Sequence, residues 1–182
     1  MCNPEKYRKK RLGLYTAALN GDWKTAESII KSDRRFVKSS VTEEYQTALH
    51  VAAGAKQTGF VKKLVNLMQN PESDLEQQDK NGNTAFCHAV IAGSVTVAKI
   101  LLKKDPELAF IRGAKNLTPL YIAVISGCPD MARLLFQQNE KHLHHLEWEH
   151  LQQIFFTSIE TDMFGKHMLP FPFIFFKNFV LE

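Results

Sequence analysis

Cysteine is scarce in this chain of 182 residues: Cys2, Cys87 and Cys128 are the only three, an odd number. A disulfide framework needs pairs, so the simple interpretation is free thiols in a reducing compartment. The sequence also lacks a Cys-x-x-Cys pair, a phosphate-binding glycine loop, a nucleophile elbow and the set of kinase motifs. These absences leave no recognised catalytic machinery, and they favour a binding function over an enzyme.

Long apolar runs are absent as well. The first residues are charged and no apolar run follows them, so we expect no signal peptide. The Phe-rich run 169–181 is shorter than the ~20 residues of a membrane span and contains Lys177. The net charge is only +4, and the basic residues are not interleaved with aromatic residues on one face, so we expect no nucleic-acid partner. A content of 45% hydrophobic and 23% charged residues is typical of a globular domain.

What the sequence does contain is a unit that recurs four times. Each copy begins with a leading apolar residue, continues as a short apolar helix and a turn, and ends as a second helix. The leading residues are separated by 35, 37 and 34 positions, by subtraction of their numbers, and are Leu14, Leu49, Phe86 and Leu120. A single unit of this size cannot bury its own apolar face, so neighbouring units are expected to stack.

The turn between the two helices is marked by glycine. Gly21, Gly93 and Gly127 each fall seven positions after the leading residue of their copy. In the second copy Gly59 falls ten positions after Leu49, which predicts three inserted residues in that turn. Eight positions beyond each glycine comes an apolar pair of the second helix: Ile29-Ile30, Leu67-Met68, Leu101-Leu102 and Leu135-Phe136.

A second turn precedes the first helix of each copy. Asn81-Gly82 is the strongest turn signal in the chain and predicts a type I′ turn, in which both central residues have positive φ. Thr84 follows where an N-cap belongs. Tyr45 and Asn116 stand at the position of Gly82 in the neighbouring copies, so those two hairpins are predicted to be less regular.

A period near ~33 residues, with a Thr-Pro-Leu-His-like start and two helices per unit, resembles the ankyrin repeat. The resemblance implies an all-α fold: a solenoid of stacked helix-turn-helix units joined by short β-hairpin-like loops. It covers four repeats between residues 12 and 139, at about 12–44, 45–80, 81–115 and 116–139. Only His50 keeps the histidine of the family motif, with Cys87 and Tyr121 in its place elsewhere; beside Thr47 it is expected to link the hydroxyl and the backbone at the repeat start, not to act as a base.

Four short sequence segments make the resemblance more specific. The segments 31–36 and 103–108, with 19–23 and 155–158, are similar to the plant ankyrin proteins that carry a C-terminal PGG-type transmembrane region. The resemblance implies that the repeats are the cytosolic part, with a role in stress or defence signalling. The membrane region of that family has no counterpart in this chain, so one interpretation is a shortened form of such a protein.

The segments on either side of the repeats lead to further expectations. Residues 1–11 are expected to form a basic arm, solvated or else serving nuclear import or attachment to an anionic membrane surface. Residues 140–164 read as a linking helix and a partial fifth repeat. Residues 165–182 are expected to be a disordered Phe-rich tail, either a non-native end of a truncated product or an anchor that dips into a membrane.

One cluster offers metal chemistry. On a helix His142, His145 and Glu149 lie near one face, and two histidines with a carboxylate can hold zinc, which would make a metal-dependent enzyme the remote alternative. Ligands from a single helix seldom close a tetrahedral site without help from another element. The favoured interpretation is a polar outer face, so we expect no metal and no cofactor.

The surface most suited to binding is the concave side of the stack. The family motif directs outward the hairpin tips and the free side of the inner helices, and the resulting groove is acidic at one end and basic at the other. The predicted contacts are Glu43, Glu44, Gln46, Lys56, Gln57, Lys80, Asn81, Asn83, Arg112, Lys115 and Ser126. The resulting hypothesis is a non-enzymatic module, expected in the cytoplasm or at the cytosolic face of the plasma membrane, that binds another protein and no small-molecule substrate.

Overall fold

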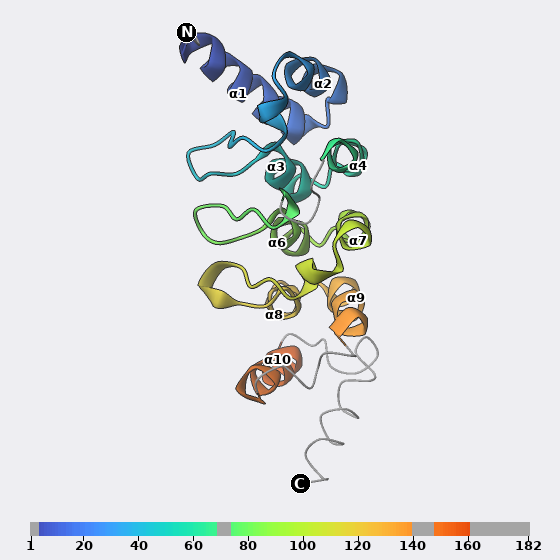
Figure 1. Ribbon diagram of the computed structural model, residues 1–182. Coiled ribbons are helices and arrows are strands. Elements are labelled where there is room, and N and C mark those ends of the chain that lie inside the picture. The colour runs from blue at the N-terminus through green and yellow to red at the C-terminus, as the bar shows by residue number, and fades with distance from the viewer. Residues whose placement is uncertain (1–3, 69–73, 140–147, 161–182) are drawn as a thin grey trace.

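The described helices form two columns that run along the stack in the computed structural model, which describes residues 4–68, 74–139 and 148–160 (Figure 1). The inner column contains α1 (Pro4–Asn20), α3 (Ala48–Gly54), α6 (Ala85–Ile91), α8 (Pro119–Ile125) and α10 (Trp148–Glu160). The outer column contains α2 (Trp23–Ser32), α4 (Thr58–Leu67), α7 (Val95–Lys104) and α9 (Pro129–Asn139). The predicted all-α solenoid of helix-turn-helix units is confirmed.

Threonine fixes the start of the inner helices α6 and α8. The hydroxyl of Thr84 accepts a hydrogen bond from the backbone N–H of Cys87 at 3.2 Å, and the hydroxyl of Thr118 accepts from Tyr121 at 3.3 Å. Each bond satisfies one of the amides that has no partner in the first turn of a helix. The short helices α6 and α8 therefore begin at the residue that follows each threonine.

The turn between inner and outer helix has the same length in every repeat, which corrects one prediction. Gly21, Gly93 and Gly127 have φ values of 73°, 69° and 64°, and Lys56 takes the equivalent position with φ 59°. Lys56 lies seven residues after Leu49, so the three-residue insertion predicted from Gly59 is wrong. A lysine can adopt the left-handed conformation at an energetic cost, so the spacing of the glycines does not mark this turn.

The extra length of the second repeat lies elsewhere. Residues Leu64 and Val65, fifteen and sixteen positions after Leu49, are buried and correspond to Leu101 and Leu102 of the third repeat. The predicted pair Leu67-Met68 is therefore out of register by three positions. The surplus falls after α4, in the connection to the next hairpin.

One continuous apolar core runs through the stack. Each inner helix packs against its neighbours, α3 between α1 and α6 and α8 between α6 and α10, while α7 contacts α4, α6 and α9. The 3₁₀ helices η1 (Arg34–Val37) and η2 (Pro106–Ala109) follow outer helices, and each buries one large side chain, Phe36 and Leu108. These two 3₁₀ helices overlap the segments 31–36 and 103–108, whose sequences are similar to the plant ankyrin proteins.

The N-terminal segment is helical, which corrects a second prediction. Helix α1 begins at Pro4, so residues 4–11 belong to it and are not an arm in front of it. Tyr7 stacks on Phe36 with 5.1 Å between ring centroids, the Lys10 ammonium donates to the Ser32 hydroxyl at 2.7 Å, and the Arg11 guanidinium donates to the Thr42 carbonyl at 3.0 Å. These contacts hold the basic segment against the first repeat.

At the other end, α10 packs against α8, where Ile154 and Ser158 are fully buried. This is the place that the inner helix of a fifth repeat would take. The Phe-rich tail and the expected membrane anchor lie outside the described residues. Among the described helices, none is long and apolar enough to cross a membrane.

Candidate functional site: the hairpin row and the inner-helix ladder

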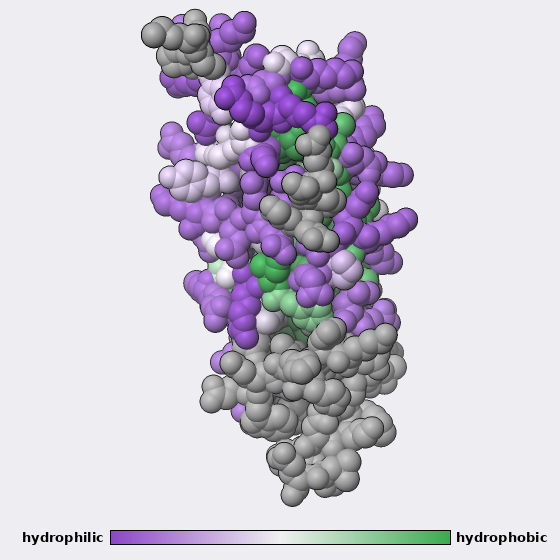
Figure 2. All heavy atoms as spheres, viewed as in Figure 1, coloured by the Kyte–Doolittle hydropathy of each residue, from purple (hydrophilic) through white to green (hydrophobic). Residues whose placement is uncertain are grey.

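Three loops project from the inner helices in the same direction and lie one above another (Figure 1). Each is a hairpin closed by a backbone hydrogen bond: Val41 to Gln46 at 2.7 Å, Asp79 to Asn83 at 2.9 Å, and Gly113 to Leu117 at 2.8 Å. We call the hairpins 41–46, 79–83 and 113–117 the hairpin row. Hydrophilic side chains dominate the surface on this side of the molecule (Figure 2).

The middle hairpin is organised by one buried carboxylate. Asp79 Oδ1 accepts hydrogen bonds from the backbone N–H groups of Asn81 at 2.9 Å and Asn83 at 3.0 Å. The Gly82 N–H donates to the Asp79 carbonyl at 2.9 Å, which places Lys80 and Asn81 at the centre of the turn. Only Gly82 has a positive φ here, 85°, so the predicted type I′ turn is wrong: the turn is one of negative φ followed by a left-handed glycine.

The first and third hairpins, 41–46 and 113–117, make the same bend without a glycine at the position of Gly82. Tyr45 and Asn116, at the position of Gly82, have φ values of 61° and 60°, and Lys115 has 55°. The predicted irregularity is therefore present as left-handed residues that carry a Cβ, and the first hairpin is one residue longer than the others. The Arg112 guanidinium donates to the Asn116 carbonyl at 3.0 Å and stabilises the third tip.

Hydrogen bonds between neighbouring hairpins join the row into one unit. The Lys80 N–H donates to the Glu44 carbonyl at 2.8 Å, which ties the second hairpin to the first. The Ala114 N–H donates to Asn83 Oδ1 at 2.9 Å, which ties the third hairpin to the second. The side chain of Gln78 adds a bond to the Arg112 carbonyl at 3.0 Å. The tips are therefore held at fixed spacing before any partner arrives.

His50 connects the hairpins to the inner helices. Its Nδ1 accepts from the Thr47 N–H at 3.1 Å and lies 2.8 Å from the Thr47 hydroxyl, so Nε2 carries the proton. Nε2 then donates to the carbonyls of Gln77 at 3.1 Å and Asn83 at 3.2 Å. The expected structural role of His50 is confirmed. Burial, with a smaller effect of neighbouring His88, lowers the pKa of His50 to about 4.

A second histidine, which the sequence did not single out, braces the same hairpin. His88 Nε2 lies 2.8 Å from Asp79 Oδ2, and the rings of His88 and His50 meet edge to face at 5.5 Å. Burial acts to raise the pKa of Asp79, but the bonds from His88, Asn83 and Asn81 outweigh it, and the pKa is lowered. The sequence signal for this pair is an aspartate that begins the turn, Asp79, followed nine positions later by a histidine, His88, on the next helix.

The titration of His50 gives a pH dependence. The pKa of His50 is about 4 when folded and near 6.5 when unfolded, so the unfolded chain binds more protons between these values and acid destabilises the fold. We expect the free energy of unfolding to fall by about 2 kcal/mol between pH 7 and pH 5. Asp79 does not contribute in this interval, because its pKa is lowered from a value already below 4.

Urea unfolding at the two pH values measures this effect, with His50→Gln as the matched control that cannot titrate. A His50→Gln variant that loses as much stability as the parent chain on acidification would contradict the assignment to His50.

The structure brings together most of the predicted contact residues. Glu43 and Glu44 are exposed at the first hairpin, Lys80 and Asn81 at the second, and Lys115 at the third, so the row runs from acidic to basic. Gln46 is a half-buried member of the row, and half-buried Arg112 directly precedes the third hairpin.

Three predicted residues, Lys56, Gln57 and Ser126, lie outside the hairpin row, and a fourth, Asn83, belongs to the row but does not reach its surface. Asn83 is buried and is occupied by its bond to Ala114, so its placement on the free surface is wrong. Lys56 and Ser126 are exposed but lie beyond the C-terminal ends of α3 and α8, at the far side of the inner helices from the hairpins. Gln57 lies beside Lys56, and its amide donates to the Leu19 carbonyl of the preceding repeat at 2.9 Å.

Apolar residues that the sequence reading missed lie on the inner helices. Leu19, Ile91 and Ile125 are 43%, 49% and 45% exposed, and each falls five positions after the leading residue of its repeat. Exposed Gly54 occupies the same position in the second repeat. We call Leu19, Ile91 and Ile125 the inner-helix ladder. The equal offset from Leu14, Phe86 and Leu120 was the signal that could have found it.

The histidine cluster behind the remote alternative of a metal-dependent enzyme consists of His142, His145 and Glu149. His142 and His145, together with the side chain of Glu149, lie outside the described residues. Within the ranges that the structure does describe, no group of three or more histidine, cysteine, aspartate or glutamate residues could hold a metal ion.

Stacked helix pairs with hairpins projecting in one row define a helical-repeat solenoid. A family model described as ankyrin repeats, in three copies, matches residues 14–109 and 62–145, which together exceed half of the chain. The chain therefore belongs to the ankyrin-repeat family. Ankyrin repeats serve as scaffolds for protein–protein interaction.

A human relative shares part of this sequence. The protein named SMC5-SMC6 complex localization factor protein 1, from Homo sapiens, is 29% identical over 133 residues. The match covers 73% of this chain but only 12% of the relative, so the chain spans a small part of that protein's length.

Proposed function

We propose that this protein binds a partner protein along the concave surface formed by the hairpin row and the inner-helix ladder. The observation that carries the proposal is the chain of hydrogen bonds from Glu44 through Lys80 and Asn83 to Ala114, which fixes the three tips relative to one another. A preordered surface loses little conformational entropy on binding, so more of the contact energy appears as affinity.

The chemistry of the surface suggests what the partner presents. Exposed apolar side chains at regular spacing contribute favourable burial, while the charged tips contribute orientation and rate of encounter. Glu43 and Glu44 at one end favour a basic segment, and Lys80 and Lys115 towards the other end favour an acidic one. We infer a partner whose apolar contact strip runs along the stack, with charges of opposite sign at its two ends.

Reversing two charges tests this surface. A Lys80→Glu, Lys115→Glu variant is expected to capture the partner at least about tenfold less well than the parent chain, because like charges then face each other. Its melting temperature is expected to be unchanged, since neither side chain supports the fold. The measurement is affinity capture from cell extract with quantification of the co-purified proteins.

The matched control reverses two exposed lysines on the outer column, Lys99→Glu with Lys103→Glu in α7. This control should capture the same proteins as the parent chain. Equal capture by both double variants would place the binding surface elsewhere.

The resemblance to plant ankyrin proteins supports a finer proposal: a role in stress or defence signalling in the cytoplasm or at the cytosolic face of the plasma membrane. The name of the human relative describes a localization factor for a complex, which supports the related proposal that the repeats position an assembly by binding one of its members. In both cases the repeats supply recognition, and the partner supplies the activity.

A further inference from the structure

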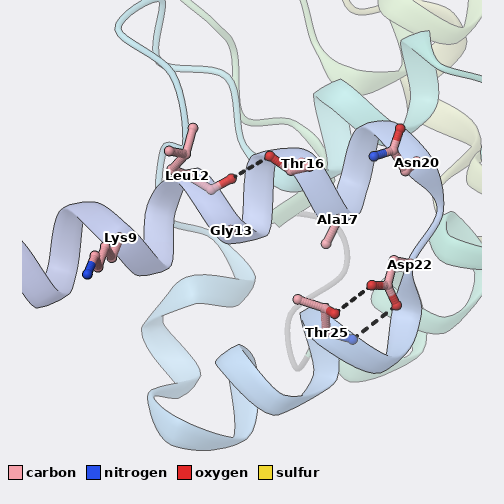
Figure 3. Close-up of a pocket in the computed structure, with 8 residues that line it drawn as sticks. All are labelled: Lys9, Leu12, Gly13, Thr16, Ala17, Asn20, Asp22 and Thr25. Carbon is pink, nitrogen blue, oxygen red and sulfur yellow. Dashed lines mark hydrogen bonds between the residues drawn. The ribbon is translucent and has the colours of Figure 1, made fainter.

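Helix α1 is the first inner helix of the described stack, and it has a packed inner neighbour on one side only. Helices α3, α6 and α8 each lie between two inner helices, whereas α1 contacts α3 below it and α2 beside it. At this open end a groove of about 470 Å³ runs between α1 and α2 (Figure 3). Lys9, Leu12, Gly13, Thr16, Ala17 and Thr25 line it, and Asn20 and Asp22 close the end beyond Ala17. The Asp22 carboxylate accepts hydrogen bonds from the Thr25 N–H and hydroxyl.

The floor of the groove consists of small residues. Gly13 lies so close to α2 that a Cβ at this position would come within 3.2 Å of the Ile29 Cδ1 atom. Ala17, one turn further along, is buried. Small residues keep the two helices close together and leave a shallow channel above them, into which the side chains of another helix can fit.

Leu12 is an exposed apolar side chain at a position that is polar and buried in the later repeats. It lies two positions before Leu14, where the other repeats have the buried N-cap threonines Thr47, Thr84 and Thr118. In the first repeat the helix continues through this position, and Leu12 is left 64% exposed at the edge of the groove. Leu12 therefore offers an exposed apolar surface beside the groove, at the position where three later repeats have a threonine cap.

Three cationic side chains lie near the N-terminus of α1. Lys6, Arg8 and Lys9 are exposed and form no ion pair within the part of the chain that the structure describes, whereas Lys10 and Arg11 are bound to the first repeat. Glu5 is the acidic residue among them. Cations near a helix N-terminus oppose the helix dipole, so these side chains do not stabilise α1. Their charge is available to a ligand.

We propose that the groove between α1 and α2 is a second docking site, separate from the hairpin row, that binds an acidic amphipathic helix of a partner protein. The apolar stripe of that helix covers Leu12 and the floor at Gly13 and Ala17, and its carboxylates meet Lys6, Arg8 and Lys9. Charge complementarity selects this occupant. A nucleic acid would need more cations and exposed aromatic residues for stacking, and a bilayer would need more than one exposed leucine on this face.

The test uses a fluorescent 20-residue helical peptide with glutamates on one side and a leucine–alanine stripe on the other, measured by fluorescence anisotropy against the full chain. A matched peptide with lysine in place of every glutamate is the charge control. We expect saturable binding of the acidic peptide, weakened by salt, and none of the lysine peptide.

Two variants locate the site. Arg8→Glu with Lys9→Glu is expected to weaken the acidic peptide by roughly tenfold and to bind the lysine peptide instead, and exposed Leu12→Ser is expected to weaken the acidic peptide without lowering the melting temperature. The Lys80→Glu, Lys115→Glu variant should bind as the parent does, which separates this site from the hairpin row.

Three results would overturn the proposal: no binding of the acidic peptide to the parent chain, equal binding by all variants, or stronger binding to phosphatidylserine vesicles or to single-stranded DNA than to the peptide. The gain of lysine-peptide binding by the reversed variant keeps the test decisive even if that variant is less stable.

Discussion

Leu101→Ala is expected to lower the free energy of unfolding by ~2–5 kcal/mol, the cost of deleting a fully buried leucine and leaving a cavity. Leu101 has no exposed surface and lies in α7, which packs against α4, α6 and α9. The substitution therefore loosens contacts between the second, third and fourth repeats at once. A domain of this size has only ~5–15 kcal/mol of stability, so the loss is a large share of the total.

Urea unfolding followed by circular dichroism measures the loss. Lys99→Ala, exposed on the same helix, is the control and should change the free energy of unfolding by less than ~0.5 kcal/mol. A Leu101→Ala variant as stable as this control would mean that the outer column does not pack as described.

His50→Ala is the second large change, with an expected loss of about 3 kcal/mol, because three backbone groups lose the imidazole as a hydrogen-bond partner. Of the three, the Asn83 carbonyl keeps the bond from the Asp79 N–H. The imidazole serves the Thr47 N–H and the carbonyls of Gln77 and Asn83, and the alanine methyl replaces none of these bonds. It also removes a side chain that is 2% exposed, which leaves space between two repeats. The same unfolding measurement applies.

Here the control is His50→Gln, which retains one donor and one acceptor on a side chain of similar length. We expect it to recover part of the loss. If alanine and glutamine were equally destabilising, the shape of the His50 side chain and not its hydrogen bonds would explain its role. If both substitutions left the free energy of unfolding unchanged, the hydrogen bonds of His50 would not contribute to stability.

The helices and their order could be predicted from the sequence because each depends on local signals. A threonine before an apolar run predicts a helix start, and an apolar pair at the proper offset predicts a buried outer helix. The prediction failed at Lys56, where a non-glycine residue adopts the left-handed conformation that glycine adopts elsewhere. The false insertion and the misplaced pair Leu67-Met68 both followed from that one substitution.

The basic segment shows a different limit of sequence reading. Residues 4–11 lack a stripe of aliphatic side chains, so their composition indicated a solvated arm. In the structure the single aromatic ring of Tyr7, with Lys10 and Arg11 as donors, fixes the segment as the first part of α1. Contacts of this kind join residues more than 20 positions apart and leave no local pattern.

In the candidate site, the charged hairpin tips could be predicted from the sequence, but the hydrogen bonds that hold them could not. The charged tips, from Glu43 to Lys115, follow directly from their position in the repeat. The bonds that make them rigid, such as Ala114 to Asn83, join residues about one repeat apart and are visible only in three dimensions. Asn83 was therefore assigned to the surface when its side chain is committed to the fold.

Hydrogen exchange, compared between the free protein and the protein with its captured partner, shows directly whether the partner binds the hairpin row and the inner-helix ladder. Binding is expected to slow the exchange of backbone amides in the hairpin row, at 41–46, 79–83 and 113–117, and around Ile91 and Ile125. Exchange in the outer helices α4 and α7 should stay unchanged. Protection confined to α4 and α7, with the hairpin row exchanging as in the free protein, would contradict the proposed binding surface.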